Sequence, residues 1–227
     1  MAAQLDFTCV AAHIGFIRSD SNNTGNNFHV LLNAPIRMRV IAGTLKGRRL
    51  DPPTWDGLRP TSDKLRETLF NVLAPRIAGA RVLDGFAGTG ALGIEAISRG
   101  ALHVTFVERD RRAQRLVASN LTRCGIANCY AIIGTTVLQA IEALRGEPSF
   151  DIVLLDPPYA GPRAPSSGIS DDNNAVLEAV GAIVKAGGVV VYEHAKKRQP
   201  PEAAGSLVRS RHVISGDSAL TIYACQP

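Results

Sequence analysis

The sequence predicts an α/β fold: a doubly wound, mostly parallel seven-stranded sheet with a C-terminal antiparallel hairpin. Short apolar runs alternate with amphipathic helical stretches along residues 81–193. The runs are almost continuously apolar, which is typical of parallel strands covered by helices on both faces. Two final runs are joined by Ser215-Gly216-Asp217-Ser218, which predicts the hairpin. A chain of 227 residues, 45% hydrophobic and 20% charged, can bury one large core, which excludes a mostly disordered protein.

Each expected element is predicted from the spacing of apolar residues along the chain. Strands are expected at 81–86, 103–108, 130–133, 150–156 and 188–193, and the hairpin strands at 208–214 and 219–225 on the sheet edge. Helices are expected near 91–99, 110–124, 136–145 and 173–185. One more helix should follow Pro60-Thr61, because Leu65, Leu69 and Leu73 share one face at helical spacing.

Three regions of the chain differ in composition. Residues 1–37 are polar, with five asparagines and no clear period, and are expected to be a disordered, dispensable extension. Residues 38–60 form a basic N-terminal segment, and residues 61–227 form the α/β domain. Met38 directly precedes strand-like sequence, which raises the hypothesis that the natural chain starts there.

The positive charge is concentrated in one stretch. Residues 37–66 hold eight of the 25 Lys and Arg residues against three acids, so the entire formal net charge of +5 lies there. Such a stretch is a candidate phosphate-binding surface, and a solvated face is the alternative.

The four cysteines form no C-x-x-C pair and have no histidine at ligand spacing, so reduced thiols in a cytoplasm and no metal site are expected. No run approaches the roughly 20 apolar residues of a membrane span.

A glycine-rich turn follows the strand that ends at Asp84. The spacing Gly88-x-Gly90-x-x-Gly93 matches the dinucleotide fingerprint, so a nicotinamide-dependent oxidoreductase must be considered. However, the charge of Asp84 would oppose a pyrophosphate at the helix N-terminus. The same carboxylate would favour the ammonium and sulfonium groups of S-adenosylmethionine. A tight turn without a ligand is the third interpretation.

Two further acids end strands of the same expected sheet. Glu108 lies 18 residues after Gly90, where an acid can accept hydrogen bonds from ribose hydroxyls in dehydrogenases and methyltransferases alike. Asp156-Pro157-Pro158-Tyr159 follows an apolar strand. Because proline lacks an N–H donor, Asp156 and the Pro157 carbonyl can accept both hydrogens of an exocyclic amine on a base. Tyr159 offers a face on which a flipped base can stack.

These motifs resemble a known family. Asp84-x-Phe86-x-Gly88-x-Gly90 with Asp156-Pro157-Pro158-Tyr159 is similar to the class I, Rossmann-like S-adenosylmethionine-dependent amino-methyltransferases. The segments 38–50 and 58–71 resemble the bacterial 16S rRNA guanine-N2-methyltransferases of the RsmD type. The resemblance runs from about Met38 to the C-terminus.

The resemblance implies a role for each motif. It implies that S-adenosylmethionine is held by Asp84, Phe86, Gly88, Gly90, Glu108 and Thr136, that Asp156, Pro157 and Tyr159 hold the target guanine, and that RNA is bound by Arg39, Lys46, Arg48, Arg49, Arg59 and Arg66. The implied partner is 16S rRNA, in the small ribosomal subunit or an assembly intermediate, and the implied protein is a cytoplasmic monomer that uses no metal and no membrane.

The chain departs from the family pattern at two places. Such enzymes often place an acid or an amide after the third strand, where this chain has Thr136-Val137, so adenine recognition should rely more on backbone groups. The loop 160–174 is longer than expected, and it is either a lid over the base or a surface loop.

Other activities remain open from the residues alone. The Asp-Pro-Pro-Tyr chemistry also suits adenine N6, cytosine N4 or a protein glutamine amide as methyl acceptor. A nicotinamide-dependent oxidoreductase and a non-catalytic RNA-binding protein are the alternatives from other classes.

Overall fold

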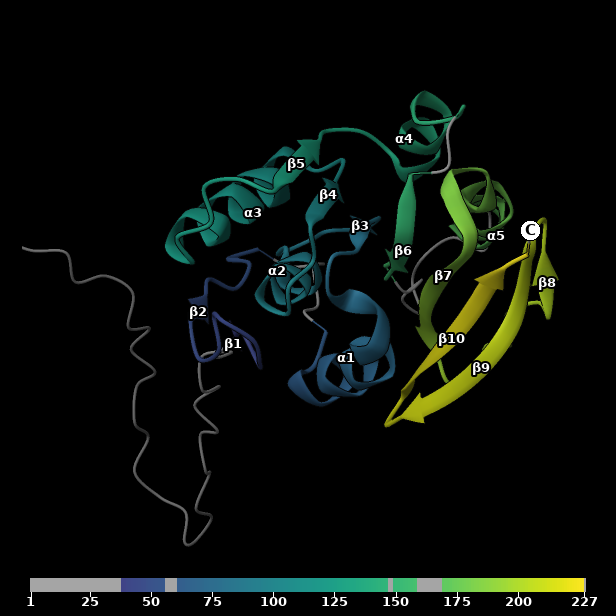
Figure 1. Ribbon diagram of the computed structural model, residues 1–227, viewed down its shortest axis with the longest axis horizontal. Coiled ribbons are helices and arrows are strands. Elements are labelled where there is room, and N and C mark those ends of the chain that lie inside the picture. The colour runs from purple at the N-terminus through teal and green to yellow at the C-terminus, as the bar shows by residue number, and fades with distance from the viewer. Residues whose placement is uncertain (1–37, 56–60, 147–148, 159–168, 227) are drawn as a thin grey trace, which may run out of the picture. The chain divides into compact units, whose positions relative to one another are not determined.

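The computed structural model describes residues 38–55, 61–146, 149–158 and 169–226, and of 169–172 it describes only the backbone (Figure 1). The predicted extension 1–37, Arg59 and Tyr159 lie outside the described residues. In the described part of the chain, no helix is long and apolar enough to cross a membrane.

An eight-stranded sheet forms the centre of the domain. Its spatial order is β5-β4-β3-β6-β7-β10-β9-β8. The strands are β3 (Arg81–Asp84), β4 (His103–Val107), β5 (Tyr130–Ile133), β6 (Phe150–Leu155), β7 (Val184–Ala195), β8 (Ala203–Ala204), β9 (Leu207–Ser215) and β10 (Ser218–Cys225). The first five strands pair in parallel and the rest antiparallel, which confirms a mostly parallel sheet with a terminal hairpin.

The expected count of seven strands was wrong for this sheet. The eighth strand, β8, has only two residues and pairs with the edge of β9, so it is too short to show a strand period in the sequence. The predicted terminal hairpin is confirmed: β10 pairs antiparallel with β7, and β9 pairs antiparallel with β10.

The boundaries differ most around the fifth helix. It spans Ile169–Val180 rather than 173–185, and β7 begins at Val184, so the predicted loop 160–174 is helical from Ile169 onward. Lys185-Ala186-Gly187-Gly188 has a turn-like composition, but it forms an irregularity inside β7, where the pairing with β6 shifts register.

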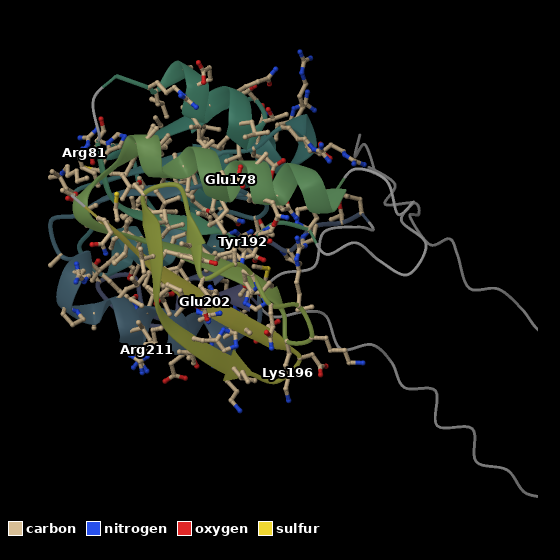
Figure 2. All side chains as sticks on the ribbon, turned by 90° about the vertical axis from the view of Figure 1, so that its right-hand side faces the viewer. Arg81, Glu178, Tyr192, Lys196, Glu202 and Arg211 are labelled. Carbon is tan, nitrogen blue, oxygen red and sulfur yellow. The ribbon has the colours of Figure 1, made fainter. Side chains whose placement is uncertain are left out.

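Helices cover both faces of the sheet. They are α1 (Asp63–Ile77), α2 (Ala91–Ser98), α3 (Arg111–Arg123), α4 (Val137–Ala143) and α5 (Ile169–Val180), followed by the 3-10 turn η1 (Gly181–Ile183). Helices α1 to α3 bury their apolar side chains in one core and α4 and α5 in another. Figure 2 shows α5 on one side of the outer strands and α1 on the other. Successive strand residues such as Val82 and Leu83 enter opposite cores, which confirms the doubly wound arrangement.

The basic N-terminal segment forms a small ribbon on the first core. Strands β1 (Met38–Arg39) and β2 (Arg49–Leu50) pair antiparallel. The side chains of Met38, Val40 and Leu50 are buried in the core that α1 and α2 share. The ribbon is therefore packed as part of the domain rather than projecting from it.

Candidate active site

Four carboxylates gather at one edge of the sheet. Asp84 ends β3, Glu108 follows β4, Asp156 follows β6, and Glu193 lies near the end of β7. These strands are parallel neighbours, so their carboxyl ends meet at the same edge. The chain order also reverses between β3 and β6, and ligands of open α/β sheets bind at such a switch point.

Asp84 has one satisfied and one unsatisfied oxygen. Its Oδ2 accepts the backbone N–H of Gly93 at 2.9 Å, and its buried Oδ1 has no hydrogen-bond partner among the described residues. Burial raises the pKa of Asp84 to about 7, against the Gly93 hydrogen bond, and Asp156 and Glu108 add to the rise. A cation or a donor at Oδ1 would relieve this cost, so the carboxylate fits the ammonium of S-adenosylmethionine.

The glycine loop after β3 has the backbone that close ligand approach requires. Gly88 and Gly90 have φ values of 54° and 78°, and Gly90 is the N-cap of α2. Gly93 has a different role, because a Cβ there would lie 2.2 Å from the ring of Phe106 on β4. The third glycine of the dinucleotide spacing is thus explained by helix–strand packing. Phe86, also predicted to contact the cofactor, is partly buried and packs on the second core.

Glu108 is fixed by two backbone donors. Its Oε2 accepts the N–H of Gly88 at 3.0 Å and its Oε1 accepts the N–H of Asp110 at 2.8 Å. The carboxylate is thereby tied to the glycine loop. Each oxygen keeps a lone pair that could accept a ribose hydroxyl.

Asp156 is held by a residue that comes before α1. The hydroxyl of Thr61 donates to Asp156 Oδ2 at 2.6 Å, and the side chain of Glu193 is also hydrogen-bonded to Asp156. Burial raises the pKa of Asp156, and these two hydrogen bonds oppose the rise. Pro157 is buried and Pro158 is exposed. The described part of the Asp-Pro-Pro-Tyr motif is therefore a rigid acceptor at the switch point.

Thr136 serves first as a helix cap. Its hydroxyl accepts the N–H of Gln139 at 3.3 Å, and the Gln139 side chain bonds back to the N–H of Thr136 at 3.4 Å, which forms a capping box at the start of α4. The hydroxyl and the backbone N–H of Thr136 are the two groups that could hydrogen-bond to an adenine, and both already have a partner in the capping box. The role of Thr136 in cofactor binding stays a prediction.

Comparisons with known proteins agree on one family. The family model described as "Conserved hypothetical protein 95" matches residues 38–224. YlbH of Bacillus subtilis (strain 168) is 37% identical over 187 residues, which is 82% of this chain and 98% of YlbH. "Ribosomal RNA small subunit methyltransferase D" of Escherichia coli (strain K12) is 35% identical over 188 residues, which is 82% of this chain and 89% of that protein. This chain belongs to the small-subunit rRNA methyltransferase D family.

A solved structure supports the same assignment at the level of the fold. The Escherichia coli protein yhhF matches with a TM-score of 0.70 and 30% identity, and the match covers 84% of this chain and 98% of yhhF. The similarity to the methyltransferase D family thus extends from the β1–β2 ribbon into the C-terminal hairpin.

The basic residues that the methyltransferase D resemblance implied separate into two groups. Lys46, Arg48 and Arg49 are exposed, and Arg39 is exposed with an ion pair to Asp63 at 3.4 Å. Arg66 is different, because its side chain is completely buried. Its Nη2 donates to the carbonyl of Arg39 and to Asp63 Oδ1, each at 2.7 Å. RNA cannot reach Arg66 in this conformation, so the prediction that it contacts RNA is not supported by its position.

The ribbon and the candidate active site lie at opposite ends of α3. The guanidinium of Arg48 is next to Gly125, just past the C-terminal end of the helix. The ring of Trp55 lies 5.1 Å from the guanidinium carbon of Arg112, at the N-terminal end. A helix of 13 residues spans about 20 Å. The chain from 48 to 55 therefore follows α3 toward the sheet edge where Glu108 lies.

Sequence reasoning assigned no separate role in the site to Thr61, Glu193 or Trp55. The signal for Glu193 was present, because a charged residue ends the apolar run 189–192, as Asp84 and Asp156 end theirs. Trp55 is the chain's single tryptophan and lies in a segment without a period, so only the structure places it. In the described part of the chain, no three His, Cys, Asp or Glu side chains are grouped as metal ligands.

Proposed function

We propose that the protein transfers a methyl group from S-adenosylmethionine to the exocyclic N2 of a guanine in 16S rRNA of the small ribosomal subunit. The observation that carries this proposal is the pairing of two acids at the β3–β6 switch point. Asp84 offers an unsatisfied oxygen for a cation, and Asp156 is held as an acceptor for an amine. The rRNA substrate is inferred from the printed name of the Escherichia coli relative.

The described residues fit S-adenosylmethionine. Asp84 Oδ1 would accept from the ammonium group, the Gly88–Gly90 backbone would allow close approach, and Glu108 would accept from the ribose. When bound, the cofactor supplies a methyl group that its sulfonium charge has already activated. The same acidic surroundings would repel the pyrophosphate of a nicotinamide cofactor, which disfavours the oxidoreductase alternative.

The chain's own residues would orient the acceptor. Asp156 and the carbonyl of Pro157 would accept the two hydrogens of the guanine amine, which directs the nitrogen lone pair away from the ring and toward the methyl carbon. Thr61 would keep Asp156 in the orientation that this requires. The proton on N2 is lost after transfer, so Asp156 acts as a hydrogen-bond acceptor rather than as a strong base. Tyr159 and the exposed cations of the ribbon would hold the base and the RNA.

One assay tests reaction, target and family together. The full chain is incubated with methyl-labelled S-adenosylmethionine and small ribosomal subunits that lack their native methylations, and the RNA is digested to nucleosides. Label in N2-methylguanosine is the expected result. Label in another nucleoside would keep the chemistry and overturn the guanine target. Saturable cofactor binding without label in RNA would overturn the RNA substrate and lead to protein and DNA acceptors.

A further inference from the structure

The stretch after Glu108 is a second concentration of positive charge. Residues 109–123 contain one acid, Asp110, and five exposed arginines, which are Arg109, Arg111, Arg112, Arg115 and Arg123. All but the first lie on α3, whose buried residues are Ala113, Val117, Asn120 and Leu121. Because an α-helix has 3.6 residues per turn, Arg111 and Arg115 lie on the outer face of the helix, opposite these buried residues.

Two of these arginines hold the chain that runs along α3. Arg112 forms an ion pair with Asp110 at 2.8 Å, and its guanidinium carbon lies 5.1 Å from the centre of the Trp55 ring. Arg123 forms an ion pair with Asp51 at 3.0 Å. Each of these two charges thus has an acidic partner, and the fold explains their positions.

The other three arginines, which we call the α3 arginine cluster, have no such explanation. Among the described residues, Arg109, Arg111 and Arg115 form no ion pair. Arg111 lies in the first turn of α3, where the helix dipole disfavours a cation. Arg111 and Arg115 are also four residues apart, so their like charges repel across one turn. These charges destabilise the helix, and a bound anion would relieve both effects.

The α3 arginine cluster lies on the path between the N-terminal ribbon and the candidate active site. The side-chain amide of Gln114 donates to the backbone carbonyl of Glu108 at 2.8 Å, which ties the start of α3 to the site. Strand β2 packs against α3, and the guanidinium of Arg48 lies next to Gly125, beyond the C-terminal end of the helix (Figure 1). A polyanion that follows α3 from the ribbon to the site would therefore pass over the cluster.

We propose that Arg109, Arg111 and Arg115 bind backbone phosphates of the RNA substrate next to the active site, and so extend the RNA-binding surface from the ribbon along α3. This inference rests on the proposed function, because the RNA that it names is the proposed methyl acceptor. S-adenosylmethionine carries no phosphate, so the cofactor alone would leave these cations unpaired. An RNA backbone carries a phosphate at each nucleotide and can contact several cations along a helix at once.

Variants of the full chain test this surface. Arg111→Gln/Arg115→Gln removes two charges and keeps polar side chains, whereas Arg111→Lys/Arg115→Lys keeps the charges. The matched control is Arg76→Gln/Arg145→Gln, because Arg76 lies in the last turn of α1 and Arg145 just after α4, and both are exposed. The chain after each of these helices leads into the start of a parallel strand, so both residues lie toward the edge of the sheet opposite the active site.

Four quantities are measured for each variant. They are the affinity for unmethylated small ribosomal subunits between about 50 and 200 mM salt, the initial rate of methyl transfer, the affinity for S-adenosylmethionine by calorimetry, and the free energy of unfolding in urea. Binding and transfer are measured on the same subunits, so the two effects can be compared directly.

The glutamine variant should bind small subunits about 10- to 100-fold more weakly at low salt, and the slope of log K against log salt should fall by about 0.7–0.9 for each lost phosphate contact. The KM for the subunit should rise, whereas kcat at saturating subunits and the affinity for S-adenosylmethionine should not change, because these arginines do not touch the reacting groups. The lysine variant should recover most of the affinity. The glutamine variant should be as stable as the wild type or more stable, because the repulsion on α3 is removed.

Three results would overturn the α3 surface. They are a wild-type affinity and salt slope in the glutamine variant, an equal loss of affinity in the control variant, or a loss of stability that accompanies the weaker binding. Tighter binding of a DNA duplex than of the small subunit, lost in the same glutamine variant, would overturn RNA as the partner. Failure of the proposed function looks different, because a wild-type protein that binds the subunit through these arginines but transfers no methyl group overturns the reaction and leaves the surface.

Discussion

The two oxygens of Asp84 have unequal surroundings, and this asymmetry has a consequence for cofactor binding. One oxygen is bonded to the Gly93 amide and the other is buried without a partner in the described structure. Ionisation of the Asp84 carboxyl is therefore unfavourable until a cation binds. Because its pKa is about 7, this carboxyl changes its charge within the physiological pH range.

Binding of S-adenosylmethionine should consequently depend on pH. A cationic ligand binds the ionised form of Asp84, whose pKa is raised, so binding releases a proton. The affinity should rise about tenfold per pH unit below pH 7 and level off above it. Asp84→Asn should bind more weakly and lose this dependence. Calorimetry from pH 5.5 to 8.5 measures both effects. Asp151→Asn is the control, because Asp151 lies near the N-terminal end of β6, opposite the edge that carries Asp84 and Asp156. The proposed cofactor site is wrong if Asp151→Asn removes the pH dependence and Asp84→Asn does not.

Asp156 should affect turnover without affecting cofactor affinity. Asp156→Ala removes the acceptor that Thr61 holds and is expected to abolish transfer, while the affinity for S-adenosylmethionine stays nearly unchanged. Single-turnover rates and equilibrium binding of the labelled cofactor measure the two effects. A large loss of cofactor binding in this variant would mean that Asp156 belongs to the cofactor site and not to the acceptor site.

At the scale of elements, the docking of the N-terminal ribbon depends on α2. Glu95 on this helix is completely buried, and its two oxygens accept the N–H groups of Ile41 at 2.7 Å and Ala42 at 3.0 Å. It also accepts from Arg99 at 2.8 Å. One side chain thus satisfies three donors and ties the turn after β1 to the sheet domain.

Replacing Glu95 should destabilise the fold far more than replacing a similar exposed acid. Glu95→Ala leaves the two amides and Arg99 without their partner, so the free energy of unfolding should fall by about 3–5 kcal/mol. The matched control is Glu142→Ala, because Glu142 also pairs with an arginine one helical turn away but is exposed. Glu142→Ala should lower the free energy of unfolding by about 0.5 kcal/mol or less. Urea unfolding of both variants measures the difference, and equal costs would contradict the docking role of Glu95.

Local signals predicted most of these elements, and their failures have physical causes. The helices start where capping residues stand, as Ser62, Asp110 and Thr136 show. Strands β1, β2 and β8 were not predicted as paired elements, because two residues cannot show a period and their pairing depends on distant partners. Arg66 looked like a surface cation, and its burial depends on the carbonyl of Arg39, a contact across 27 positions. The strand-end acids Asp84 and Asp156 were predictable, whereas their hydrogen-bond partners were not.

At the scale of the whole molecule, the basic ribbon and the sheet edge are separate surfaces joined along α3. Arg48 lies at one end of this helix and Trp55 at the other. An RNA that reached both would have to extend over about 20 Å. The exposed cations of the ribbon should therefore contribute to affinity for RNA and not to the chemical step.

Salt dependence separates these contributions. Replacing Arg48 and Arg49 together by Ala should weaken RNA binding and lower the slope of log K against log salt by about one unit per lost phosphate contact. The kcat at saturating RNA should be unchanged. Arg145→Ala is the control, because it removes an exposed arginine that lies just after α4 and pairs with Glu142. An unchanged slope in the double variant would make the ribbon's cations a solvated face.

Truncation tests which part of the chain the fold needs. The family model begins at residue 38, and the ribbon buries Met38, Val40 and Leu50 in the first core. A chain that starts at Met38 should therefore keep its Tm and its transfer activity.

A chain that starts at Asp51 loses three buried apolar side chains, worth about 1.5–3 kcal/mol each, and the donors to Glu95. This loss is comparable with the roughly 5–15 kcal/mol that stabilises a whole domain, so the shorter chain should unfold cooperatively at a much lower temperature. Calorimetry of both chains is the measurement. Loss of transfer in the chain that starts at Met38, with an unchanged Tm, would assign residues 1–37 a role in substrate binding rather than in the fold.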